Sequence, residues 1–150
     1  MGENYLEHKL RAILSADVKG YSLLMADDEI ATIQTITSYR EIMKSLIQEH
    51  KGRVVDSPGN NLLAEFKSEV DAVQYAVKIH KKLKVENDEL PPERRMNFRI
   101  GINLGDIAQE GERNYGDGMN IAARIESKAG PGGISISDTE MDTNIRENRR

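Results

Sequence analysis

The chain contains no cysteine among its 150 residues. Disulfide bonds, thiolate zinc sites and cysteine nucleophiles are therefore excluded. Histidine occurs only three times, at scattered positions, which disfavours a histidine-based metal cluster. No apolar run approaches the roughly 20 residues of a membrane-spanning helix, and the N-terminus lacks the apolar core of a signal peptide. We expect a soluble, cytoplasmic protein.

The chain also lacks an excess of basic residues. It has 21 Lys and Arg against 25 Asp and Glu, a formal net charge of −4. This balance disfavours nucleic acid or an anionic membrane as the main partner. A polyanionic ligand would need a local basic group or a bound cation. The absence of a GxxxxGK[ST] segment makes a P-loop ATPase an unfavoured alternative.

The apolar pattern predicts one α+β domain with a ferredoxin-like βαββαβ core, extended by a further helix and strand. The helices are expected on one face of the sheet, which leaves the other face for a ligand or partner. Ile30, Ile33 and Val70 are expected on inner helix faces, and Lys51-Gly52 is expected to end the first long helix. The predicted elements are strand 10–18, helix 27–50, hairpin strands within 53–66, a helix from Ser68, strand 96–104, helix 117–128 and a strand in 133–137.

The segment ADVKGYS, residues 16–22, is the first candidate for chemistry. Asp17 ends a buried strand, where its carboxylate could hold Mg²⁺. The following turn enters a helix, and its backbone N–H groups could face phosphate oxygens. The local sequence supports equally well a carboxylate that only caps the next helix.

The hairpin tip SPGNN is the second candidate. In a βαββ arrangement the first and third strands are neighbours, so Asn60 should lie beside Asp17. Two-metal phosphoryl chemistry needs carboxylates at such a junction, whereas here one acid meets two amides. Ordinary turn residues that tolerate left-handed geometry are the alternative, and Asn61 is interpreted as one of these.

Asn120 and Arg124 are the third candidate, because i, i+4 spacing places them on one face of a helix. An amide beside a guanidinium suits a sugar oxygen and a phosphate whose charge grows in the transition state. The alternative is a surface arginine paired with Glu126 or another acid.

Together, ADVKGYS, GNNLLAEF, FRIGINLGDI and YGDGMNIAARIE resemble the catalytic domain of class III adenylyl and guanylyl cyclases, in bacterial form. The resemblance implies conversion of ATP, or less favourably GTP, to a 3′,5′-cyclic nucleotide and pyrophosphate in a head-to-tail homodimer with two Mg²⁺ or Mn²⁺ ions. Asp17 and the Val18 carbonyl would bind metal, Asn120 would orient the ribose, and Arg124 would stabilise the transition state. The implied phosphate-binding turn comprises Lys19, Gly20, Tyr21 and Ser22.

The chain departs from the family pattern at several positions. The second metal-binding acid falls on Asn60, so we expect weakened metal binding and impaired activity. The base-selecting positions fall on Asp56 and Arg113, with signs opposite to those of adenylyl cyclases. The expected boundaries are an N-terminal extension 1–9, a cyclase domain 10–137 and a polar, truncated or disordered tail 138–150, with regulatory domains in the full-length protein.

Three hypotheses follow from these residues. The first is a metal-dependent nucleotide cyclase, and the second is a non-catalytic nucleotide-binding or dimerisation module of the same fold. The third is a palm domain for polymerase-type transfer, which would lack both a second acid and a basic template groove.

Overall fold

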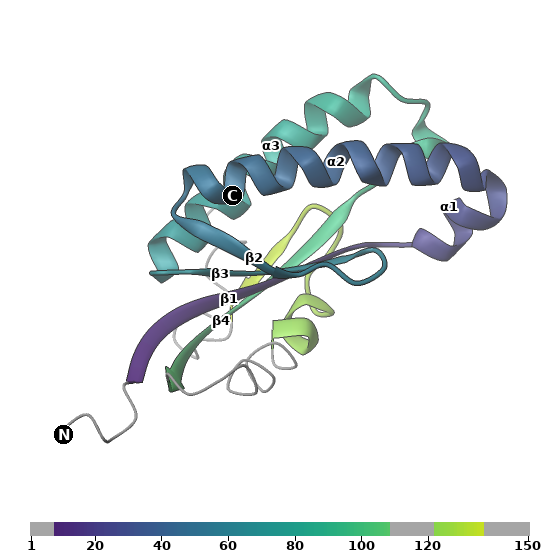
Figure 1. Ribbon diagram of the computed structural model, residues 1–150. Helices are drawn as coiled ribbons and strands as arrows, with labels where there is room; N and C mark the ends of the chain where they lie inside the picture. Colours follow the sequence, from purple (N-terminus) through teal and green to yellow (C-terminus); the bar gives the residue numbers. More distant parts are fainter. Residues whose placement is uncertain (1–7, 109–121, 137–150) are drawn as a thin grey trace.

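A computed structural model describes residues 8–108 and 122–136 of the chain. The described elements form a five-stranded sheet in the order β2-β3-β1-β4-β5. Figure 1 shows α2 and α3 lying across the same face of this sheet, with α1 at one end. The elements are β1 His8–Val18, α1 Tyr21–Asp27, α2 Glu29–Glu49, β2 Gly52–Asp56, β3 Asn61–Phe66, α3 Glu69–Asp88, the 3₁₀ turn η1 Pro92–Arg94, β4 Phe98–Ala108 and β5 Ile134–Ile136.

The strand pairing confirms the predicted α+β fold and ferredoxin-like core. Central strand β1 pairs antiparallel with β3 on one side and β4 on the other, while β5 runs parallel to β4. Asp17 lies opposite Asn61 of β3 and Arg99 of β4. The expected meeting of the first strand with the hairpin tip is therefore confirmed.

The face under α2 and α3 holds the main apolar core. Along β1, alternate residues point into it because successive side chains of a strand face opposite sides. The sheet contributes Ala12, Leu14, Ala16, Val18, Leu62, Ala64, Phe66, Phe98, Ile100, Ile102, Ile134 and Ile136 to this core. The helices cover these side chains with Ile36, Tyr39, Met43, Ile47, Tyr75, Ala76, Ile79 and Leu83, among others.

Three apolar residues expected inside are exposed: Ile30 by 71%, Ile33 by 45% and Val70 by 62%. In α2 the first inner position belongs to Thr32, which is fully buried. Its hydroxyl donates to the Leu24 carbonyl oxygen at 2.9 Å and ties α2 to α1. Because the buried hydroxyl has a hydrogen-bond partner, Thr32 can occupy this interior position. The hydrophobic periodicity therefore predicted the wrong residues of the first turn of α2 to face the core.

Helix α2 ends at Glu49, just before Lys51-Gly52, as predicted. The left-handed residue is Lys51, with a φ of 64°, and not the glycine beside it. Gly52 belongs to β2, where a Cβ would lie 2.5 Å from a ring carbon of Phe66. The glycine is required for close packing of the hairpin on the core.

The second face of the sheet is not left fully open. Residues 122–126 are helical and lie on the side opposite α2 and α3 (Figure 1). Gly101 of β4 permits this approach, because a Cβ there would lie 2.5 Å from the Ala122 carbonyl oxygen. The helix adds a small layer to this face and carries Glu126 onto it.

Candidate active site

Asp17 stands one residue before the end of β1, on the face opposite the main core. Its side chain is partly buried, with 21% exposed. The turn after β1 is held to the neighbouring segment because the Lys19 N–H donates to the Asn97 carbonyl oxygen at 3.0 Å. The carboxylate therefore has a fixed location at the sheet end and still reaches solvent.

The hairpin tip lies next to this carboxylate. Gly59 has a φ of 57°, which turns the chain between β2 and β3. The Asn60 amide Nδ2 then donates to the Val18 carbonyl oxygen at 3.4 Å. Asn60 and the Val18 carbonyl, two of the three expected metal-binding groups, are in direct contact.

Asn61 is not the plain turn residue that the sequence suggested. It is the first residue of β3, paired with Asp17 across the ladder. Its side-chain oxygen lies 3.5 Å from the Ser15 hydroxyl oxygen. Strand alternation places Asn61 on the same sheet face as Asp17, so both amides belong to the site.

The turn after β1 leads through Gly20 into helix α1, as expected, but one of its backbone N–H groups already has a partner within the protein. Gly20 adopts a φ of 73° as the residue before the helix, and its carbonyl oxygen accepts from the Leu23 and Leu24 N–H groups. Because the Lys19 N–H is engaged with Asn97, that group does not face a phosphate. The proposed phosphate contacts rest on Gly20, Tyr21 and Ser22.

An ion-pair network that the sequence did not predict surrounds Asp17. The Arg99 guanidinium lies 3.3 Å from Asp17 Oδ1 and 3.2 Å from Glu126 Oε2. The Ser15 hydroxyl donates to Glu126 Oε1 at 3.2 Å. Arg99 thus bridges two carboxyl groups that come from β1 and from the helix on the second face.

The side chain of Glu126 is only 3% exposed. Burial, followed by the hydrogen bond and the charge of Asp17, raises its pKa to about 8, while Arg99 and Ser15 act in the opposite direction. The direction of this shift favours the protonated form of Glu126, which lies against both Arg99 and Asp17.

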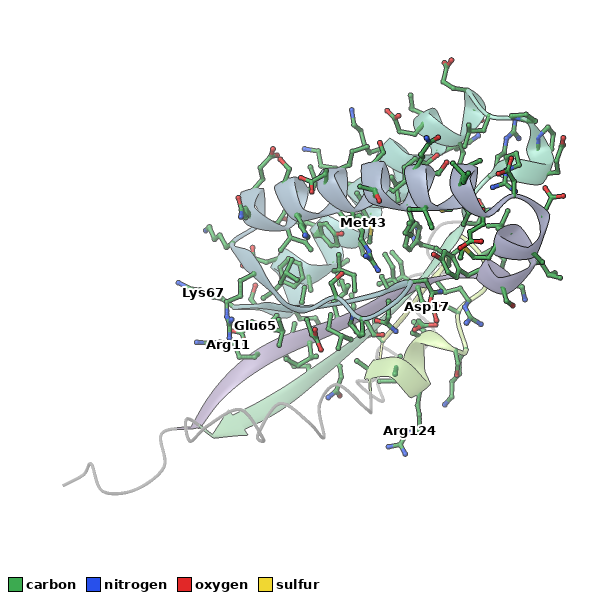
Figure 2. The ribbon with its side chains drawn as sticks, turned by 45° about the vertical axis from the view of Figure 1, so that its right-hand side comes forward. Arg11, Asp17, Met43, Glu65, Lys67 and Arg124 are labelled. Carbon is green, nitrogen blue, oxygen red and sulfur yellow. The ribbon has the colours of Figure 1, made fainter. Side chains whose placement is uncertain are left out.

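Glu126 is also the acid that the sequence suggested as an alternative ion-pair partner for Arg124. The structure overturns that pairing, because Glu126 faces Arg99 inside the protein. Arg124 is exposed and extends away from the sheet and from Asp17 (Figure 2). A signal in the sequence could have found this, since Ala122, Ile125 and Ala129 form an apolar face that includes position 126.

The other expected site residues are placed only in part. Asp56 ends β2 and is exposed, and its carboxylate accepts from the Ser57 N–H at 2.8 Å. Asn120 and Arg113 lie outside the described residues. The i, i+4 relation of Asn120 and Arg124 and the pairing of Asp56 with Arg113 therefore stay predictions.

The donor groups at the sheet end suit a hard divalent cation in kind. A carboxylate, a backbone carbonyl and an amide oxygen are the ligands that Mg²⁺ and Mn²⁺ prefer. The set contains one charged donor, Asp17, where the two-ion arrangement would use two. Among the residues that the structure describes, no group of three His, Cys, Asp or Glu side chains is placed to hold a metal.

A family model for the adenylate and guanylate cyclase catalytic domain matches residues 6–147. The chain belongs to this family. It is 42% identical over 139 residues to a protein of Rhizobium meliloti (strain 1021) named "Putative adenylate cyclase 3". That match covers 92% of this chain and 24% of the relative, so the chain spans about a quarter of the relative's length.

Solved structures agree with this assignment. An adenylate/guanylate cyclase/hydrolase from Silicibacter pomeroyi is 34% identical, with a TM-score of 0.78 over 97% of this chain and 84% of that one. The adenylyl cyclase CyaB from P. aeruginosa has a TM-score of 0.77 at 20% identity, over 91% and 81% of the two chains. The second similarity shows a shared fold. Within the described part of the chain, no helix is both long and apolar enough to cross a membrane.

Proposed function

We propose that this domain is a divalent-metal-dependent nucleotidyl cyclase whose activity is impaired by Asn60. The observation that carries the proposal is the meeting of Asp17, the Val18 carbonyl and Asn60 at one end of the sheet. This is where the family resemblance requires metal ligands. The bound cations would offset phosphate charge and lower the pKa of the attacking hydroxyl.

The proposed reaction is an intramolecular phosphoryl transfer on ATP. The ribose 3′-oxygen forms a bond to the α-phosphorus and loses its proton to solvent, while the bond from that phosphorus to the oxygen bridging to the β-phosphate breaks and pyrophosphate leaves. Asp17 binds cation, and the N–H groups of Gly20, Tyr21 and Ser22 contact phosphate oxygens. Asn120 orients the ribose, and Arg124 stabilises the charge on the transferring phosphoryl group.

The orientation of Arg124 supports a site shared between two copies. Its side chain is exposed and extends away from Asp17 of the same chain (Figure 2). In a head-to-tail homodimer, Arg124 of one copy would complete the site that contains Asp17 of the other. The sedimentation coefficient at increasing protein concentration tests this, and a strict monomer would contradict it.

The alternative is a nucleotide-binding or dimerisation module without catalysis. It is favoured by the neutral amide of Asn60 and by the engagement of Asp17 with Arg99. Preference for ATP over GTP is part of the first proposal and rests on the resemblance, since Asp56 and Arg113 do not carry the usual base-selecting charges.

Turnover with Mn²⁺ and either ATP or GTP distinguishes the two functions. Asn60→Asp restores the missing carboxylate and should raise turnover at least tenfold, because one electrostatic group at such a site commonly contributes a factor of about 10² to 10³. Gln34→Glu, the same kind of change on the exposed surface of α2, should have no effect. If no form shows turnover but nucleotide still binds, the regulatory module is favoured.

The role of Arg124 is tested in the Asn60→Asp background. Arg124→Ala should lower the restored turnover by about 10² or more, whereas Lys128→Ala, an exposed change nearby, should not. Mixing the Asp17→Asn and Arg124→Ala forms should recover part of the turnover, because a mixed dimer contains one intact site. Unchanged turnover in the Arg124→Ala form would remove its proposed role.

A further inference from the structure

Arg99 contacts the one carboxylate on which a cation at this site would depend. Its Nε and Nη2 lie 3.4 and 3.3 Å from the same oxygen, Asp17 Oδ1. A guanidinium at this distance already supplies positive charge to the carboxylate. A metal ion bound to Asp17 would be placed within a few ångströms of a second cation.

The Arg99 side chain is held in this position from the other side. Glu126 Oε2 lies 3.2 Å from Nη2, and Glu126 is itself fixed by the Ser15 hydroxyl at 3.2 Å. Arg99 is 24% exposed, and it stands on β4 directly opposite Asp17. Moving the guanidinium away from Asp17 would require breaking these contacts, so the positive charge is a fixed part of the site.

The hairpin tip does not offset this charge. Asn60 and Asn61 are neutral amides, and they lie beside Val18 and opposite Asp17. A carboxylate at position 60 would add negative charge beside Asp17 and oppose the positive charge of Arg99. With asparagine there, the tip adds no negative charge to offset the Arg99 guanidinium, which lies 3.3 Å from Asp17 Oδ1.

We propose that Arg99 is a determinant of metal affinity in this domain, a fixed cation that lowers the affinity of Asp17 for divalent ions. This inference rests on the proposed function, because it requires that Asp17 binds metal. Removal of the Arg99 charge should tighten Mn²⁺ binding. A single charge within about 4–6 Å of an ionised group shifts its equilibria by about tenfold or more, and partial solvent exposure favours the lower figure.

The test is Mn²⁺ binding without nucleotide, followed by the electron paramagnetic resonance signal of unbound Mn²⁺ at constant pH and ionic strength. Arg99→Met should lower the Kd roughly tenfold, both in the original chain and in the Asn60→Asp background. Arg99→Lys, the matched control that keeps the charge, should leave the Kd within about twofold. Arg99→Gln is a second neutral variant, and circular dichroism melting reports whether each variant is folded.

Asp17→Asn separates the inference from the proposed function. If Asp17→Asn abolishes binding but neutral variants at position 99 bind no more tightly than Arg99→Lys, the inference about Arg99 is wrong and the metal site stands. If Asp17→Asn leaves Mn²⁺ binding unchanged, or if no form binds Mn²⁺ even with Asn60→Asp, the metal site and the inference both fail. Equal tightening by Arg99→Lys and Arg99→Met would exclude charge as the cause.

Discussion

The two faces of the sheet are built on different physical principles. The face under α2 and α3 is a continuous apolar core in which Phe66 packs against Tyr75 with ring centroids 5.3 Å apart. The face under residues 122–126 holds a polar cluster in which Arg99 joins Asp17 and Glu126. Apolar contacts tolerate many partners, whereas a buried charged network depends on each member being paired. Stability therefore resides mainly in the first face, and the candidate site lies on the second.

The largest loss of unfolding free energy is expected from Phe66→Ala, a substitution in the apolar core of the first face. The ring is fully buried, and removing a buried phenylalanine typically costs about 3–5 kcal/mol through lost burial and a cavity. Urea unfolding should show this loss. Leu23→Ala, at a side chain that is 76% exposed, should change little. Equal losses for the two variants would contradict the placement of the core.

The second face should show a pH dependence that comes from Glu126. Its pKa is raised from 4.5 to about 8 in the folded protein, so the folded state holds a proton that the unfolded state releases. Its stabilising contribution is complete below about pH 4.5 and is lost as the pH rises through 8. Since one pKa unit corresponds to about 1.4 kcal/mol, the loss is on the order of a few kcal/mol.

Glu126→Gln isolates this contribution, because glutamine resembles the protonated acid in shape and does not titrate. Between pH 5 and 8.5, the original chain should lose more unfolding free energy than the Glu126→Gln variant. Glu41→Gln, at an exposed position on α2, is the control. Parallel curves for the original chain and Glu126→Gln would show that Glu126 is ionised throughout.

A smaller effect is expected from Gly101→Ala. The added Cβ would meet the backbone of Ala122 and Glu126, so the helix must shift away from β4 at a cost of about 1–3 kcal/mol. Gly130→Ala, where a Cβ meets nothing within 4 Å, should be nearly neutral in urea unfolding. If both variants are equally stable, the close docking of residues 122–126 on β4 is wrong.

Most of the fold could be predicted because hydrophobic periodicity reports one-sided burial. Strand 96–104, with its alternating pattern, corresponds to part of β4, and the Ser68 cap is confirmed by its contact with the Asp71 N–H at 3.1 Å. The predictions were wrong where packing between elements, and not the local sequence pattern, selects the buried residue. Ile30 and Ile33 match a helical stripe, but the packing of α2 against α1 selects Thr32 for the interior.

The candidate site was predictable in its location and not in its electrostatics. Asp17 at a strand end and Asn60 at a hairpin tip follow from local sequence and from the βαββ order. Arg99 and Glu126 lie 27 residues apart in the chain, and no short-range pattern connects them. Arg124 was the more conspicuous partner for Glu126, yet it lies on the exposed side of the helix.

The sequence by itself determined the order of the strands and of the two long helices, the position of Asp17 near the end of β1, and the neutral residue at position 60. Each of these depends on residues close together in the chain. The tertiary structure alone decided which charges meet. β4 lies beside β1, and a helix docked on Gly101 carries Glu126 to Arg99. Electrostatic interactions depend on distance in space and on burial, and neither is fixed by separation along the chain.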